Sequence, residues 1–131
     1  MRGLHLTADL SGVDPALALM LDPEPLRTLC IEAVAQAGLG AVAEVFHRFT
    51  PAADPGQTGI TGVMLLAESH LAVHTWPELA AVTVDVYVCN RGLDNSEKAE
   101  VLMARLVQAF APQFVITNRL ERGLRAGPLP R

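Results

Sequence analysis

The sequence predicts an α+β domain in which one antiparallel sheet carries two helices on one face. Six segments show the alternation or the β-rich composition of strands, and two longer segments show the period of an amphipathic helix. Their order along the chain is β-α-β-β-β-β-α-β. Strands that follow one another in a run, with only two helices available, favour an antiparallel two-layer arrangement over a parallel doubly wound sheet.

The clearest strand is 4–10, where leucine and alanine alternate with His5, Thr7 and Asp9 before Ser11-Gly12 ends the pattern. The β-rich composition predicts the other strands at 42–49, 60–67, 71–76, 81–88 and 114–120. Proline, glycine and aspartate at 51–59 indicate an exposed loop between the second and third strands.

Each predicted helix has one apolar stripe. The first stripe is Leu26, Leu29, Cys30, Ala33, Val34 and Ala37, and the second is Ala99, Leu102, Met103, Leu106, Val107 and Phe110. Asp22 is the predicted cap of the first helix, which Gly38 or Gly40 ends. Asp94 or Asn95 is the predicted cap of the second, which stops at Pro112. The tail at 124–131 lacks an apolar period, so we expect it to be mobile.

Composition narrows the class of protein. The 131 residues fit one domain, 1–131, and half of them are apolar, which supports a folded core. A net charge of −4 disfavours a nucleic-acid partner, and the sequence contains no apolar run of the roughly 18 residues that span a bilayer. The alternating N-terminus does not resemble a signal peptide. We therefore expect a soluble, cytoplasmic protein whose two cysteines, Cys30 and Cys89, are free thiols.

The sheet also predicts a homodimer. The segments 63–67 and 82–88 are apolar on both sides, so the sheet face opposite the helices needs cover. Two helices do not suffice to cover both faces, and a second copy of the chain would supply the missing layer.

The segment 68–78 is the most unusual part of the chain. It reads Glu-Ser-His-Leu-Ala-Val-His-Thr-Trp-Pro-Glu and contains two of the four histidines, the only tryptophan, a serine and two carboxylates. Composition alone is about equally compatible with a functional site and with a purely structural role, in which these polar residues lie at strand ends and Trp76 fills the core. A metal site on His70 and His74 is disfavoured because four residues of strand span about 13 Å. A serine hydrolase with Ser69, His74 and Asp85 is disfavoured because the G-x-S-x-G pattern is absent.

Read together, the residues at 68–78 resemble the self-processing segment of the prokaryotic S-adenosylmethionine decarboxylase family. Supporting similarity follows in the family's order: Leu-His-Leu-Thr-Ala-Asp-Leu at 4–10 with Gly12 and Asp14, Phe-His-Arg-Phe at 46–49 with Pro51, Thr-Gly-Val at 61–63, and Asp-Val-Tyr-Val-Cys at 85–89. The resemblance implies a four-layer αββα dimer in which two sheets face each other with the helices outside. It also implies cleavage between Glu68 and Ser69, which would give a β chain, 1–68, and an α chain, 69–131.

By this resemblance, Ser69 attacks the preceding carbonyl and ends as a pyruvoyl group, the enzyme's only cofactor, in place of a metal or pyridoxal phosphate. That group would form a Schiff base with the substrate amine and draw electrons from the bond to the α-carboxylate. His74 would remove the Cα proton of Ser69, and Thr61 stands where the family usually has a serine that stabilises the tetrahedral intermediate. Cys89 would return a proton to the substrate carbon. An uninterrupted strand would put Ser69 and His74 on opposite faces, so this role requires a bend near 68–70.

The resemblance implies that Phe49 stacks on adenine and that Trp76 and Glu78 contact the substrate, with contributions from the partner subunit. The reaction would supply the aminopropyl donor for polyamine synthesis, including spermidine. Three departures surround the pocket: a longer 51–59 loop, Thr61 for serine, and Asn90 for the glycine that follows the cysteine.

These departures leave two alternatives open. Arginine or ornithine could be the substrate, with Glu44, Asp54 or Glu78 facing its distal cation. The chain could also be a non-catalytic regulatory homologue, although the combination of Glu68, Ser69, His74 and Cys89 argues against that.

Overall fold

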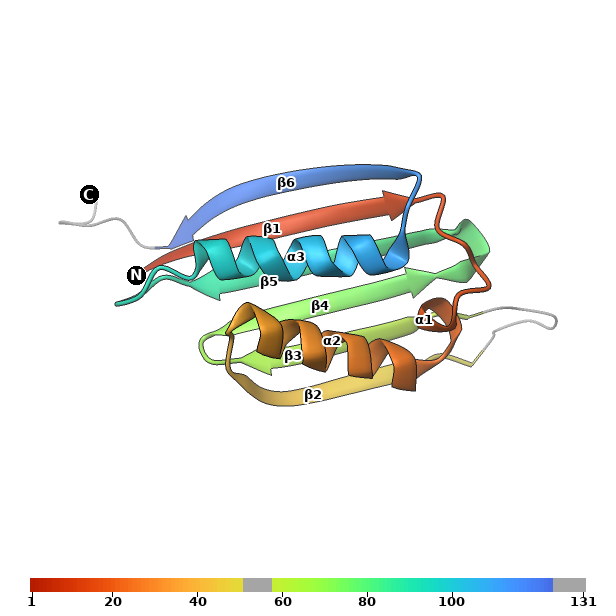
Figure 1. Cartoon of the computed structure of the whole chain (residues 1–131), viewed down its shortest axis with the longest axis horizontal. Helices are drawn as coiled ribbons and strands as arrows, with labels where there is room; N and C mark the ends of the chain where they lie inside the picture. Colours follow the sequence, from red (N-terminus) through yellow and green to blue (C-terminus); the bar gives the residue numbers. More distant parts are fainter. Residues whose placement is uncertain (51–57, 124–131) are drawn as a thin grey trace, which may run out of the picture.

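The computed structural model describes residues 1–50 and 58–123, so the predicted tail at 124–131 and most of the predicted loop at 51–59 lie outside the described residues. Six strands form one sheet in the order β2-β3-β4-β5-β1-β6, and every neighbouring pair is antiparallel (Figure 1). The strands are β1 (Arg2–Ser11), β2 (Ala41–Arg48), β3 (Ile60–Leu66), β4 (Ser69–Trp76), β5 (Ala81–Cys89) and β6 (Phe114–Gly123). All six predicted strands and the antiparallel sheet are confirmed.

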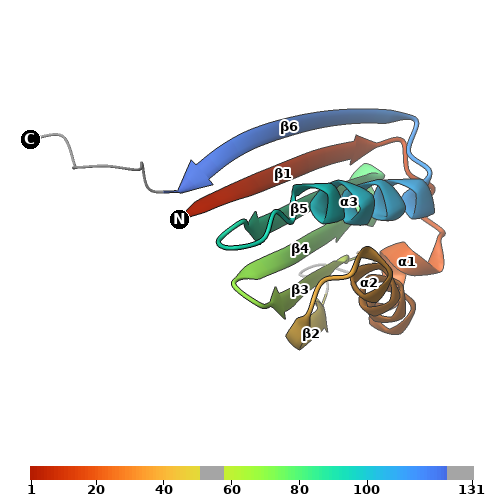
Figure 2. The same cartoon turned by 60° about the vertical axis from the view of Figure 1, so that its left-hand side comes forward.

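Two long helices, α2 (Pro23–Ala37) and α3 (Ser96–Phe110), cover one face of the sheet (Figures 1 and 2). Asp22 caps α2 by accepting a hydrogen bond from the Glu24 N–H, and Gly38 ends it with a φ of 81°, as predicted. Two short elements were not predicted, α1 (Ala18–Leu21) and the 3-10 helix η1 (Pro77–Leu79), because neither is long enough to show a period. No helix in the described part of the chain is long and apolar enough to cross a membrane.

The start of α3 differs from the prediction that Asp94 or Asn95 is its cap. Asn95 occupies the N-cap position, but its side chain makes no capping hydrogen bond. The Asp94 carboxylate instead accepts a hydrogen bond from the Ser96 N–H at 2.9 Å. Hydrogen bonds from the backbone and side chain of Ser96 hold the pKa of Asp94 below its usual value.

The core lies between the sheet and the two helices. Alternate residues of the four central strands point into it, and Val82, Val84, Val86 and Val88 of β5 are fully buried against α3 and its neighbours. From the helix layer, Leu26, Leu102 and Phe110 are equally buried. Burial of these apolar side chains is the main force that holds the helices on this face.

The opposite face, which we call the open face, has no covering element among the described residues. Its β5 side chains are Thr83, Asp85 and Tyr87, so the prediction that 82–88 is apolar on both sides is wrong. The prediction holds on β3, where Leu65 is 52% exposed. Large exposed apolar side chains on this face lie mainly toward the two sheet edges: Val45, Leu65, Phe114, Ile116 and Leu120.

One buried hydroxyl joins three elements at the end of the sheet where β4 finishes. Thr75 is 3% exposed, and its Oγ1 accepts a hydrogen bond from the Ile60 N–H at 2.9 Å. The same hydroxyl donates to the Met20 carbonyl oxygen at 2.9 Å. Thr75 therefore ties α1 and the start of β3 to β4.

Replacing Thr75 with valine should lower the free energy of unfolding by about 2–4 kcal/mol, because two buried backbone groups lose their partner. Thr75→Ser keeps the hydroxyl and loses one methyl group, so it should cost only about 1 kcal/mol. Urea unfolding at a fixed protein concentration measures both. A valine variant as stable as the serine variant would contradict this role for the hydroxyl.

Candidate functional site

The first group of candidate residues lies where β4 begins. Ala67 and Glu68 form the turn between β3 and β4, and Glu68 has a φ of 53°. This left-handed conformation costs a non-glycine residue about 1–2 kcal/mol. Ser69 follows as the first residue of β4, and its Oγ accepts a hydrogen bond from the Cys89 N–H at 3.2 Å. We call Glu68, Ser69 and Cys89 the Ser69 half-site.

The two cysteines are free, as predicted, but they lie in different environments. Cys30 belongs to α2 and is part of the core, where burial raises the pKa of its thiol to about 12. Cys89 ends β5 beside Ser69 and is 7% exposed. Cys30 is thus an inert structural thiol, and Cys89 is the cysteine that adjoins the candidate chemistry.

The second group lies toward the other end of β4. His74 Nδ1 and Thr61 Oγ1 are 3.0 Å apart, within hydrogen-bond distance, and the ring of His74 stacks on that of Trp76 with centroids 6.2 Å apart. Thr61, His74 and Trp76 border a cavity of about 340 Å³, and Phe49 and Glu78 form part of its other walls. We call Thr61, His74, Phe49, Trp76 and Glu78 the His74 half-site, and the structure brings all five together.

The two half-sites are separated within one chain. A bend is present, as the resemblance required, but it lies at Ala67 and Glu68, and β4 is uninterrupted from Ser69 to Trp76. Five residues of strand separate Ser69 from His74 by roughly 17 Å, and an odd spacing places their side chains on opposite faces. His74 of a chain therefore does not reach Ser69 of the same chain.

The same geometry argues against the metal site and the serine hydrolase considered above. His70 lies against His5 and Tyr87, whereas His74 lies against Thr61 and Trp76, so the two histidines do not converge on one metal ion. No cluster of three metal-ligating side chains occurs in residues 1–50 and 58–123. Asp85 approaches His5 at 3.8 Å rather than His74, which leaves no hydrolase triad.

The centre of the open face holds a cluster that was not predicted from the sequence. His5, His70 and Tyr87 pack with ring centroids 5.6–6.2 Å apart, and Asp85 borders them. His5 Nε2 is buried without a hydrogen-bond partner. Desolvation, and secondly the nearby His5, lower the pKa of His70; Asp85 opposes this effect and Arg122 adds a smaller lowering contribution.

An antiparallel sheet with its helices on one face, together with a serine behind a strained turn, defines a two-layer α+β protein with a candidate self-processing site. The sequence model of the S-adenosylmethionine decarboxylase family matches residues 4–123. S-adenosylmethionine decarboxylase proenzymes from Aquifex aeolicus and Hydrogenobaculum sp. are 39% and 37% identical to this chain over 123 residues, covering 93% of this chain and 82% of each relative.

A solved structure supports the same assignment. The crystal structure of the adenosylmethionine decarboxylase from Aquifex aeolicus matches with a TM-score of 0.81 and 34% identity, over 98% of this chain and 97% of that chain. The chain belongs to the S-adenosylmethionine decarboxylase family, which confirms the resemblance seen at 68–78.

The His70 pKa gives a pH prediction. The folded chain disfavours the charged imidazole, so neutral His70 contributes stability above its unfolded pKa of about 6.5, and this contribution is lost as the pH falls below that value. Proton NMR should show His70 titrating below pH 6.5. His5→Gln should raise the midpoint and Asp85→Asn should lower it. Titration of His70 at or above 6.5 in the folded protein would contradict this environment.

Proposed function

We propose that this chain is the proenzyme of a pyruvoyl-dependent S-adenosylmethionine decarboxylase that supplies the aminopropyl donor for polyamine synthesis. One observation carries the proposal most directly: in a member of this family, Ser69 follows a strained turn with its hydroxyl held by the neighbouring strand. The expected products of self-cleavage are 1–68 and 69–131. The free thiols favour a reducing compartment, which we take to be the cytoplasm.

The residues at the turn suit the cleavage chemistry. Attack of Ser69 Oγ on the Glu68 carbonyl carbon forms a C–O bond and breaks the C–N bond, and the hydroxyl proton passes to the freed amine. Removal of the Ser69 Cα proton then breaks the Cβ–O bond and releases the Glu68 carboxylate, leaving dehydroalanine. Water replaces the nitrogen, which departs as ammonia, and residue 69 becomes the pyruvoyl group. Only serine, threonine or cysteine could begin this sequence.

The proposed residues have separate tasks. His74 accepts the Cα proton of Ser69, and Thr61 donates a hydrogen bond to the tetrahedral oxyanion. The pyruvoyl carbonyl supplies an electron sink for loss of the α-carboxylate of an amino-acid substrate. The Cys89 thiol holds the proton that returns to the substrate carbon.

Because His74 and Ser69 lie far apart in one chain, we propose that each active site is shared by two copies. A two-fold axis that crosses the strands near Ala72, between two open faces in contact, would bring the Ser69 half-site of one copy to the His74 half-site of its partner. The proton to be removed belongs to a backbone carbon, so a base that arrives over the open face need not lie beside the hydroxyl. The exposed apolar side chains on that face, including Val45 and Leu65, favour this packing.

The substrate proposal rests on the cavity of the His74 half-site. Phe49 and Trp76 provide aromatic surfaces suited to an adenine ring and a sulfonium cation, and Glu78 provides a carboxylate. Of the acidic residues considered for a distal amino or guanidinium group, Glu44 is paired with Arg27 at 2.7 Å on the helix side of the sheet. Asp54 lies outside the described residues. Glu78 alone could serve either kind of substrate, so the two aromatic surfaces of Phe49 and Trp76, together with the family match, are what favour S-adenosylmethionine over arginine or ornithine.

A turnover assay tests the proposed activity. After incubation to allow maturation, the wild-type protein should release labelled carbon dioxide from S-adenosylmethionine, but not from arginine or ornithine. Ser69→Ala should release none and should remain a single chain on a denaturing gel. Release from an amino acid other than S-adenosylmethionine would overturn the substrate, and no release from any of the three would support a non-catalytic homologue.

A mixed-dimer experiment tests the shared site. Ser69→Ala keeps His74, and His74→Ala keeps Ser69, so neither variant should cleave efficiently alone. When the two are co-expressed with different tags, the His74→Ala chain should be cleaved, because its partner supplies the histidine. The double variant Ser69→Ala/His74→Ala is the matched control and should not rescue it. Mixed dimers that form but stay intact would contradict a site built from two copies.

A further inference from the structure

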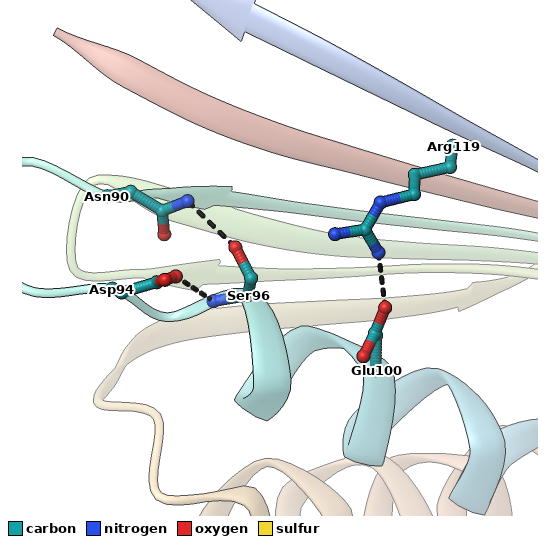
Figure 3. Close-up of polar contacts among 5 residues, drawn as sticks. All are labelled: Asn90, Asp94, Ser96, Glu100 and Arg119. Atoms are coloured by element: carbon teal, nitrogen blue, oxygen red, sulfur yellow. Dashed lines mark hydrogen bonds and ion pairs between the residues drawn. The ribbon is translucent and has the colours of Figure 1, made fainter.

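The loop between β5 and α3 contains a hydrogen-bond network that begins at Asn90. The Asn90 Nδ2 donates to Ser96 Oγ at 2.9 Å, as Figure 3 shows, and the Asn90 Oδ1 accepts from the Asn95 N–H at 2.8 Å. Asn90, which directly follows Cys89, is therefore joined through its side chain to the start of α3.

Asn95 completes the network in the opposite direction. Instead of capping α3, its Nδ2 donates to the Cys89 carbonyl oxygen at 2.8 Å. The Asn90 N–H, in the same peptide unit, donates to the Arg2 carbonyl oxygen at 2.8 Å. Both polar atoms of the peptide that follows Cys89 are thus held, the oxygen by the N-cap residue of α3 and the N–H by β1.

The peptide before Cys89 is the one that contacts the processing serine. Its N–H donates to Ser69 Oγ at 3.2 Å, so the position of Cys89 sets where that donor points. A serine side chain has three staggered rotamers, and a fixed donor favours the rotamer that meets it. Attack on the Glu68 carbonyl requires one orientation of Oγ, and a displacement of about 1 Å at a reacting atom can cost 100-fold in rate.

We propose that the Asn95 side chain acts as a clamp on the Cys89 carbonyl, which limits how far Cys89 and its N–H can turn and thereby orients the Ser69 hydroxyl for self-cleavage. Asn95 is the positioning residue, and Asn90 supports it by accepting a hydrogen bond from its backbone N–H. This inference rests on the proposed function. Neither asparagine touches the scissile bond, so both act through Cys89. The step that they assist is formation of the ester between Ser69 Oγ and the Glu68 carbonyl, with loss of the 68–69 peptide bond.

Two isosteric variants separate the proposed clamp from a structural role. Asn95→Asp replaces the donor to the Cys89 oxygen with a second acceptor, whereas Asn90→Asp keeps its acceptor for the Asn95 N–H and can accept from the Ser96 hydroxyl. Each adds one carboxylate to the same loop, so the charge change is matched. Aspartate at an N-cap favours a helix, so Asn95→Asp should not lower the melting temperature.

Cleavage of the purified proenzyme, followed by intact mass, should be at least 10-fold slower in Asn95→Asp and within 3-fold of wild type in Asn90→Asp. Asn95→Ser, an uncharged residue that also caps helices, should be slowed in the same way and carries the test should the aspartate variant not fold. Equal rates for wild type and both Asn95 variants, or equal slowing of the Asn90 and Asn95 aspartate variants, would overturn the proposal.

Hydroxylamine locates the affected step, because it cleaves an ester at 68–69 without the need for Cα proton removal. It should restore cleavage in His74→Ala, where the ester forms, but not in Asn95→Asp, where ester formation is slow. Full rescue of Asn95→Asp would overturn the proposed role. A wild-type chain that does not cleave would overturn the proposed function itself. If the wild-type chain cleaves and the Asn95 variants cleave at the same rate, only this inference is overturned.

Discussion

The continuous pairing of β4 with both of its neighbours determines how this protein can work. Residues 69–74 pair with β3 on one side and residues 70–76 pair with β5 on the other, so the strand cannot bend to bring its two ends together. The serine expected to be modified and the histidine expected to act on it are therefore kept apart by their own strand. In the proposed dimer, the open face, which carries exposed apolar side chains and which the described helices leave uncovered, is where a second copy would supply the missing half-site.

The local strain at Glu68 contributes less to the rate of the proposed self-cleavage than the positioning of Ser69 does. A left-handed non-glycine residue stores about 1–2 kcal/mol, which corresponds to a rate factor between about 5 and 30. Correct alignment of a nucleophile with a carbonyl carbon contributes about 7–11 kcal/mol in favourable intramolecular reactions. Positioning therefore outweighs strain in the proposed cleavage. The Cys89 N–H holds the Ser69 hydroxyl, and Asn95, which precedes α3, holds the carbonyl oxygen of the same cysteine.

Local patterns in the sequence predicted most of the fold, because alternation and helical period report burial directly. The strand at 4–10, the Asp22 cap and the Gly38 end of α2 all follow from short-range chemistry.

The pairing of β5 with β1 brings together segments about 80 residues apart and has no local signal, so the cluster of His5, His70 and Tyr87 was not predicted. Asp94 or Asn95 was expected to cap α3, but the Asn95 side chain bonds instead to the carbonyl of Cys89, which only the tertiary structure brings near. The residues of the candidate site were recognisable at 68–78, whereas their separation into two half-sites became visible only with the uninterrupted strand.

The central claim is that the 68–69 peptide bond rearranges and leaves a carbonyl group at residue 69. Intact-mass spectrometry of wild-type protein over time tests it most directly. The account predicts that the full-length chain disappears and that 1–68 appears with a free carboxylate, together with a 69–131 fragment lighter by one ammonia molecule than simple hydrolysis would give. A chain that stays whole, or a 69–131 fragment that still begins with serine, would contradict it.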